Sequence, residues 1–312
     1  FIFGDMLDTK HLSSVLKDVD GVILLAGLVG DPITKKYPKE SAAINDVGVK
    51  NVIDLSAKAN IEKFIFISTC SNYGLIKNNE LADEEFELNP LSLYAKSKVN
   101  AENHILSLKG KTKMSPTILR FATAFGLSPR MRFDLVINML CGMAVAQKKV
   151  ILNSDGQAWR PHLHIDDVCG AFRCCIEWEY NGGKLKVLNV GRNENNWKIL
   201  DVARLIQSKV QGGDLKFLGQ TEEEDTDDLV KDRKIQDDVD KRNYQASFKR
   251  INKTLPGFEA HFNVEAGVER LLEELERWRL NETKFKQREF YRLQQVEHLY
   301  NTKQVDDRLF LL

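Results

Sequence analysis

Residues 63–74 read KFIFISTCSNYG and indicate the fold class of this chain. The first six residues contain four consecutive apolar side chains at positions 64–67, which is typical of a strand buried on both faces. A continuous apolar run occurs at residues 21–26 (GVILLA), and residues 115–122 (SPTILRFA) are also predicted to form a strand. Between the runs, apolar side chains recur at helical spacing over residues 40–59 and 94–108. This alternation predicts an α/β fold with a doubly wound parallel sheet, in which ligands bind at the carboxyl ends of the strands.

The composition argues against several classes of function. The chain has 312 residues, and its 45 basic and 45 acidic residues give a formal charge of zero. A neutral chain lacks the basic surface that is typical of proteins that bind nucleic acid or an anionic membrane. The apolar runs are too short to span a bilayer. Five cysteines without regular spacing favour a reducing compartment, so we expect a cytoplasmic protein.

A tyrosine and a lysine form the main candidate for catalysis. Tyr94 and Lys98 lie four residues apart at the start of a predicted helix and so share one face. A nearby ammonium favours a phenolate, which predicts a lowered pKa for Tyr94 and a role as general base. Thr69 lies 25 residues before Tyr94, at the carboxyl end of the strand at 63–68. The plainer interpretations are a solvated helix for the pair and local turn capping for the threonine.

Several other short segments contribute to a pattern that extends along most of the chain. They are Gly4-Asp5-Met6, Leu25-Ala26-Gly27-Leu28-Val29, Asn45, Leu119-Arg120-Phe121-Ala122-Thr123, residues 159–168 (WRPHLHIDDV) and residues 240–244 (DKRNY). Together with Thr69, Tyr94 and Lys98, they resemble the extended short-chain dehydrogenase/reductases, the family of sugar-nucleotide epimerases and dehydratases such as UDP-glucose 4-epimerase. The resemblance covers roughly residues 1–280.

The resemblance implies a fold, a cofactor and a set of site residues. It implies a Rossmann-type sheet with a smaller carboxy-terminal substrate-binding domain, NAD as cofactor with NADP not excluded, and a nucleotide-diphosphate sugar as substrate. It implies that Tyr94, Lys98 and Thr69 are catalytic. The implied cofactor-binding residues are Asp5, Met6, Leu25, Ala26, Gly27, Val29, Asn45, Tyr94, Lys98 and Phe121. The implied substrate-binding residues are Thr123, Arg132, Arg160 and Arg242, because a guanidinium fork matches a diphosphate.

The domain boundaries follow from the same pattern. We expect a Rossmann domain at 1–126, a substrate domain at 127–280 with segments that return to the first sheet, and a helical tail at 281–312. Further helices are expected at 132–147, 166–178, 198–209 and 264–280, with a strand at 149–152. The acidic residues 221–240 are expected to form a solvated loop. The tail carries an aromatic stripe that includes Phe285, Phe290 and Tyr291. This stripe must be buried on its own subunit or on a neighbour.

The glycine-rich turn of the family is missing from the sequence. A Gly-x-x-Gly-x-x-Gly turn would place the cofactor pyrophosphate at a helix amino terminus, and none precedes Phe1. We expect an omitted segment of roughly fifty to sixty residues, the size of one βαβ unit plus a strand. The choice between NAD and NADP would be determined there.

The residues after Thr69 narrow the reaction. Dehydratase relatives have an Asp-Glu pair where this chain has Cys70 and Ser71, so 4,6-dehydration is disfavoured. We expect an epimerase that acts by transient oxidation at sugar carbon 4. The alternatives are a 4-dehydrogenase or 4-ketoreductase, because residues 126–134 resemble a branch that includes GDP-heptose 4-dehydrogenases. A cofactor-binding protein without turnover is a further alternative, against which the intact catalytic residues argue.

The histidines, the paired cysteines and two of the helices carry further expectations. No metal is expected at His162 and His164, because a third ligand and a catalytic need are missing. Cys174 and Cys175 are expected in the core. A homodimer is expected to form through the helices at 40–59 and 94–108. The apolar residues expected to remain uncovered there are Ala42, Ala43, Val49, Ile53, Ile105 and Leu108.

Overall fold

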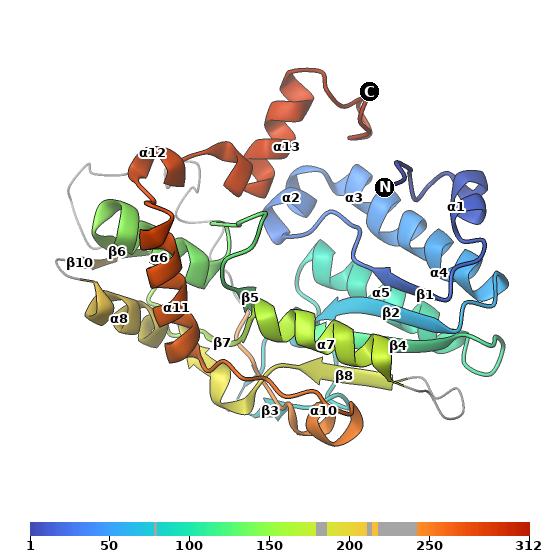
Figure 1. Cartoon of the computed structure of the whole chain (residues 1–312), viewed down its shortest axis with the longest axis horizontal. Coiled ribbons are helices and arrows are strands. Elements are labelled where there is room, and N and C mark those ends of the chain that lie inside the picture. Colours follow the sequence, from blue (N-terminus) through green and yellow to red (C-terminus); the bar gives the residue numbers. More distant parts are fainter. Residues whose placement is uncertain (78–79, 179–185, 211–213, 218–241) are drawn as a thin grey trace.

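The main sheet is parallel, as the sequence predicts. The computed structural model describes residues 1–77, 80–178, 186–210, 214–217 and 242–312. In these residues, the sheet has the strand order β1-β2-β4-β8 (Figure 1). The strands are β1 (Gly21–Leu24), β2 (Lys63–Thr69), β4 (Ser115–Phe121) and β8 (Lys186–Val190). All neighbouring strands pair in parallel, which confirms the predicted doubly wound, Rossmann-type fold.

Helices cover both faces of this sheet because successive strand residues point to opposite sides. Phe64 and Phe66 of β2 face a core formed with α4 (Val49–Lys58) and α5 (Leu93–Ser107). Ile65 between them faces the opposite core, which α7 (Ile165–Glu177) and α10 (Lys249–Thr254) help to form. Cys174 and Cys175 of α7 are buried in that second core, as expected.

The helix predicted at 40–59 is not regular. It consists of α3 (Pro38–Ala42), a π-helical segment Ala43–Gly48, and α4. A π segment widens the turn by one residue while apolar spacing nearby stays helical, so the hydrophobic pattern did not reveal it. The wider turn contains Asn45, whose side chain is buried.

A second group of elements packs beyond the carboxyl ends of the main strands. It contains the three-stranded sheet β5-β7-β9 and the parallel pair β6-β10. Their bounds are β5 (Thr123–Phe125), β6 (Lys149–Leu152), β7 (Trp159–His164), β9 (Asn196–Lys198) and β10 (Asp214–Phe217). The helices are α6 (Val136–Gln147), α8 (Ile199–Lys209) and α11 (Val264–Arg277), which share one hydrophobic core. Two short strands, β3 (Leu81–Ala82) and β11 (Gln245–Ala246), pair with each other.

The predicted elements in this half form with small shifts at their ends. The predicted strand at 149–152 corresponds to β6, and the helix predicted from 132 begins at Val136. Strand β8, from beyond residue 126, joins the main sheet beside β4. The boundaries at 126 and 280 remain predictions. The acidic segment 221–240 lies outside the described residues.

The tail packs on its own chain. It comprises α12 (Glu282–Phe285), a 3-10 turn Arg288–Phe290 and α13 (Arg292–Asn301). Phe285 is 1% exposed and Tyr291 is 8% exposed, so the aromatic part of the stripe is covered within the subunit. The amino-terminal region adds α1 (Thr9–Val15) and α2 (Asp31–Lys36). In the described part of the chain, no helix has both the length and the apolar character needed to cross a membrane.

Candidate active site

Lys98 and Tyr94 lie on one face of α5, against the end of β2. The Ser92 hydroxyl accepts a hydrogen bond from the backbone N–H of Ala95 at 3.2 Å and so caps the helix. Lys98 Nζ donates to the carbonyl of Ile67 at 2.7 Å and lies 5.8 Å from the centre of the Tyr94 ring. The lysine therefore fixes the face of α5 that carries Tyr94 to the strand that ends at Thr69.

The expected fall in the pKa of Tyr94 is wrong for this structure. Burial, together with the Asp31 carboxylate, raises the pKa of Tyr94 to about 12. The guanidinium groups of Arg132 and Arg242 oppose this shift and lower the pKa. Desolvation of a buried phenolate outweighs these two guanidinium charges. Burial also lowers the pKa of Lys98 to about 8, although Glu102 opposes this shift.

The residues after β2 make mainly local contacts. The Thr69 hydroxyl accepts the N–H of Ser71 at 3.1 Å, which is the capping role considered from the sequence. Cys70 is fully buried, and burial raises the pKa of its thiol. The Ser71 hydroxyl lies 3.2 Å from the Tyr244 hydroxyl and 3.0 Å from Arg242 Nη1. Neither Cys70 nor Ser71 supplies the acid that water elimination needs.

Arg242 reaches the end of β2 although 171 residues separate it from Ser71. Its backbone neighbour Asn243 pairs with residues 74–76, since the N–H of Ile76 donates to the Asn243 carbonyl at 2.7 Å. Its guanidinium also forms an ion pair with Asp31 at 3.3 Å. Arg242 therefore joins the start of α2 to the segment that follows β2, close enough to Tyr94 to influence its pKa.

Arg160 supports this arrangement. It is buried and donates from Nη1 to the carbonyls of Trp159 and Arg242. Its guanidinium carbon also lies 5.3 Å from the centre of the Tyr244 ring. In this structure the side chain holds the backbone that carries Arg242.

The other predicted substrate residues follow β4. Thr123 begins β5, and Phe121 ends β4 with its ring centre 5.4 Å from that of Phe172. Arg132 holds the carboxylate of Asp134 with two nitrogens, each at 2.9 Å. Arg132 Nη2 lies 4.0 Å from the place where a side chain on Gly30 would begin, so it approaches the loop after β1.

The loop after β1 is held by Asn45. The Asn45 amide accepts the N–H of Leu28 at 2.8 Å and donates to the carbonyl of Leu28 at 2.9 Å. Gly27 has φ of +154°, and a Cβ there would lie 2.9 Å from Asn45 Oδ1. Leu25 is 60% exposed despite being apolar. The loop therefore presents backbone and apolar surface beside the strand end, and Val29 and Ala26 belong to the same loop.

Asp5 and Met6 lie near the amino terminus, and Met6 contacts the helical region that carries Asn45. The Asp5 carboxylate accepts the N–H of Leu7 at 2.9 Å, and Asn51 donates to the Met6 carbonyl at 3.2 Å. Gly48 allows Met6 to pack closely, because a Cβ on Gly48 would lie 3.1 Å from that of Met6. The two residues lie against the helical region that carries Asn45.

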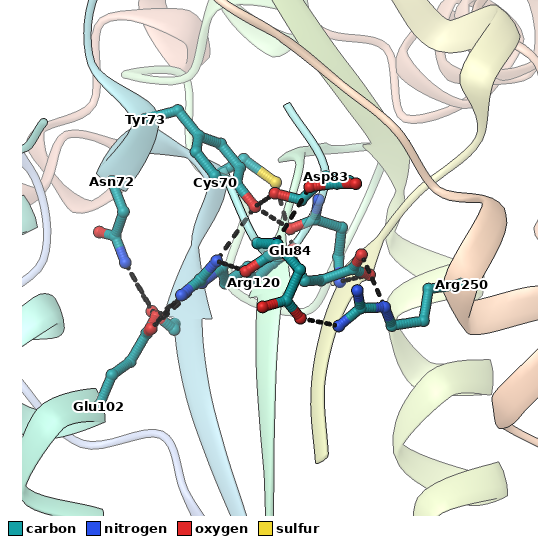
Figure 2. Close-up of polar contacts among 11 residues, drawn as sticks. Cys70, Asn72, Tyr73, Asp83, Glu84, Glu102, Arg120 and Arg250 are labelled. Atoms are coloured by element: carbon teal, nitrogen blue, oxygen red, sulfur yellow. Dashed lines mark hydrogen bonds and ion pairs between the residues drawn. The ribbon is translucent and has the colours of Figure 1, made fainter. Parts of the chain in front are cut away.

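A buried polar network lies beneath the candidate catalytic residues. Arg120 of β4 donates to the Glu102 carboxylate of α5, with a shortest distance of 2.6 Å (Figure 2). Glu102 also accepts hydrogen bonds from Ser68 and Asn72. On the other side, Arg120 Nη1 donates to the Tyr73 hydroxyl at 3.1 Å. The network joins α5 to the strands on which Thr69 and Phe121 lie.

The two histidines of β7 are structural groups. Burial lowers the pKa of His162 to about 3, so its ring is neutral. His164 stacks against Phe262 with ring centres 4.1 Å apart and accepts the N–H of Asp166 at 3.2 Å. Among the residues that the structure describes, no group of histidine, cysteine or carboxylate side chains is arranged to hold a metal ion.

Sequence reasoning missed Asp31, Glu102 and the role of Arg120. Two of them leave a signal in the sequence: Glu102 follows Lys98 by four residues on the same helix, and Arg120 is the one charged residue in β4. Asp31 leaves none, because its partner Arg242 is far away in the sequence. Only tertiary structure brings them together.

The comparison with known families decides the classification. Residues 1–191, more than half of the chain, match the model of the NAD dependent epimerase/dehydratase family. The chain belongs to this family. Membership of this NAD-dependent family also confirms the prediction of NAD as the cofactor.

Relatives in the family include proteins named as epimerases and proteins named as dehydratases. The uncharacterized UDP-glucose epimerase YtcB of Bacillus subtilis is 28% identical over 208 residues, which cover 66% of this chain and 63% of that protein. The putative UDP-glucose 4-epimerase of Methanocaldococcus jannaschii is 26% identical, with 61% and 62% covered. Human dTDP-D-glucose 4,6-dehydratase is also 26% identical, with 62% and 54% covered. The matches thus span less than two thirds of the length of these relatives.

Solved structures share the fold over most of the chain. UDP-glucose 4-epimerase of Thermotoga maritima, solved with UDP-glucose, has a TM-score of 0.73 at 20% identity, with 89% of this chain and 84% of that chain covered. MoeE5 in complex with UDP-glucuronic acid and NAD has a TM-score of 0.70 at 24% identity, with 89% and 85% covered. Both are similar to this family member in architecture.

Proposed function

We propose that this protein is an NAD-dependent nucleotide-sugar epimerase that acts by transient oxidation at carbon 4 of the sugar. The observation that carries the proposal is the arrangement around Tyr94, where a partly buried phenol lies near Lys98 and within the influence of Arg132 and Arg242. A diphosphate brings negative charge that suits two guanidinium groups, and a phenol is suited to exchange a proton with a sugar hydroxyl.

Each catalytic residue has a separate role in this proposal. The Tyr94 phenolate removes the proton from the sugar hydroxyl, and the Thr69 hydroxyl donates a hydrogen bond to the same oxygen. Lys98 holds α5 against the Ile67 carbonyl and supplies a positive charge beside the cofactor ribose. NAD, when bound at this site, would supply the chemistry of hydride transfer from carbon 4 of the sugar and back to its other face. Arg242 and Arg132 hold the diphosphate, and Arg160 supports Arg242.

The residues near the strand ends fit NAD. Asn45 fixes the loop at Leu28, and Gly27 allows this close approach, because a Cβ there would lie 2.9 Å from Asn45 Oδ1. The exposed Leu25 offers an apolar contact to an aromatic ring. We propose that Asp5, Met6, Ala26, Val29 and Phe121 complete this part of the site.

An epimerase is favoured over a dehydratase by the residues after Thr69. Elimination of water needs an acid beside the sugar, and the thiol of Cys70 is buried with a raised pKa. The Ser71 hydroxyl contacts Arg242 and Tyr244.

The free state of all five cysteines supports a reducing, cytoplasmic location.

The direct test is product analysis with a variant. The protein is incubated with UDP-glucose without added NAD, and NMR follows the formation of the carbon-4 epimer. Tyr94→Phe should lower the rate by about 10²–10⁴, whereas Tyr300→Phe, at a tyrosine 40% exposed on α13, should not. Accumulation of reduced cofactor in proportion to substrate would replace the epimerase by a dehydrogenase. Equal rates for the two variants would contradict the role of Tyr94.

A further inference from the structure

The tail is anchored beside the candidate substrate residues. The N–H of Phe133 donates to the carbonyl of Phe290 at 3.0 Å. The ring of Phe133 lies 4.8 Å from that of Phe285, 5.5 Å from that of Phe290 and 6.4 Å from that of Tyr291. Tyr291 donates its hydroxyl proton to the Phe285 carbonyl at 2.8 Å. These contacts fix the path of the chain up to the first residue of α13.

Helix α13 also contacts the region that follows the proposed cofactor loop. Glu297 forms an ion pair with Lys36 of α2, and the rings of Tyr300 and Tyr37 lie 6.4 Å apart. Figure 1 shows α13 next to α2. The tail therefore bridges the two segments that flank Tyr94 in space, the one at residues 131–134 and α2.

Arg292, the first residue of α13, enters a group of arginines. The backbone N–H of Arg292 donates to Asp134 Oδ2 at 3.4 Å. Arg132 holds the same carboxylate with two nitrogens. Burial lowers the pKa of Arg292, and the positive charges of Arg132 and Arg130 lower it further. Tyr94 is also among the groups that act on it. Arg130, Arg132 and Arg292 thus bring their positive charges together around the Asp134 carboxylate, an arrangement that favours an anionic ligand.

Polar atoms of the same region have no partner. Arg292 Nε, Gln295 Oε1 and Asp31 Oδ1 are buried without a hydrogen-bond partner among the residues that the structure describes. A buried polar atom without a partner costs about 1–3 kcal/mol, so such groups in native proteins require an explanation. A ligand with anionic oxygens and hydroxyl groups would satisfy both the donor and the acceptors.

We propose that the carboxy-terminal tail is part of the substrate site and that Arg292 binds an anionic group of the nucleotide sugar, a phosphate or a sugar carboxylate. The inference rests on the proposed function and adds a residue to it. A guanidinium matches either group with two parallel N–H···O bonds. Arg132 and Arg242 each also pair with a carboxylate of the chain, and Arg292 adds a further guanidinium, to whose Nε the described residues offer no acceptor.

Calorimetric titration of the full chain tests this inference. The ligands are UDP, UDP-glucose and UDP-glucuronic acid, and the variants are Arg292→Gln and Arg288→Gln. Arg288 is a matched control, because it lies on the same tail, is 47% exposed and pairs with the adjacent Glu289. Arg292→Gln should weaken binding by about 10- to 100-fold, the loss expected for hydrogen bonds to a charged group. Arg292→Lys should recover part of that loss.

The three ligands distinguish the two anionic groups. An equal loss for UDP and UDP-glucuronic acid identifies the phosphate, and a loss confined to UDP-glucuronic acid identifies the sugar carboxylate. Equal Tm values for the two glutamine variants check that the tail stays docked. If wild type binds these ligands and Arg292→Gln binds them equally well, the inference is wrong while the proposed function stands. If wild type binds none of them, the proposed function fails and the inference with it.

Discussion

Arg120 and Glu102 form an ion pair at 2.6 Å in which the side chains are only 5% and 1% exposed. The pair links β4 to α5, and through Ser68 and Asn72 it also reaches β2. Removal of one partner leaves an uncompensated charge in the interior. The relative position of Tyr94 and Thr69 therefore depends on a contact that neither residue makes.

Glu102→Gln should destabilise the protein by about 3 kcal/mol, because the Arg120 charge would remain buried without its carboxylate. Denaturation in urea measures the loss. Glu269→Gln on α11 is the control, since the Lys209–Glu269 pair is solvent-exposed at both ends. The control should change stability by less than about 1 kcal/mol. Similar values for the two variants would show that the buried pair has no special role.

Asn45→Ala should weaken NAD binding by about tenfold, since two hydrogen bonds of the Leu28 peptide are lost and the loop gains freedom. Fluorescence titration with NAD measures the affinity. Asn100→Ala provides the comparison, because the Asn100 amide makes only a long contact of 3.4 Å with Asp46. An unchanged affinity for Asn45→Ala would separate this loop from the cofactor site.

Asp31→Asn should move the alkaline rise of kcat/KM to lower pH. The Asp31 carboxylate raises the pKa of Tyr94, and Arg242, which Asp31 pairs with, lowers it. Loss of the negative charge thus favours the phenolate in two ways, so the pKa of Tyr94 falls. The pH dependence of kcat/KM is the measurement, with Asp201→Asn at an exposed position of α8 as the control. A shift to higher pH would contradict this assignment of the base.

The fold was predictable because it depends on local patterns. Short apolar runs gave β2 and β4, and helical spacing gave α5 and α7. The site was predictable only in part. The motif at Tyr94 and Lys98 indicated the candidate catalytic residues. The pKa of Tyr94, however, depends on burial and on Asp31, which no local pattern encodes. The partners Arg242 and Asp31 are brought together by tertiary packing alone.

The surface predicted for a dimer needs correction. Val49, Ile53 and Ile105 are buried in the core of their own subunit, so they leave no uncovered apolar area. Ala42 is exposed as expected, and the larger exposed apolar side chains on these helices include Val47 at 54%, Leu93 at 49% and Leu106 at 38%. The dimer itself remains a proposal.

A double variant tests the dimer on that corrected surface. Val47→Glu with Leu106→Glu should halve the sedimenting mass, because two charges would be buried at the interface. Ile176→Glu, at an exposed position on α7, should keep the wild-type mass. Wild type that sediments as a single chain at every concentration would refute the dimer.

The most direct test of the central claim uses UDP-glucose that carries deuterium at carbon 4. An epimerase transfers the deuterium as a hydride from carbon 4 to its cofactor and then back to the same carbon. The epimer should therefore retain the label at carbon 4, and the reaction should need no added NAD. A dehydratase returns the hydride to carbon 6 after water is lost, and a dehydrogenase leaves it on the reduced cofactor. NMR of the product locates the label. Deuterium at carbon 4 of the epimer is the predicted result, and deuterium at carbon 6, in the solvent or on accumulated NADH would contradict the account.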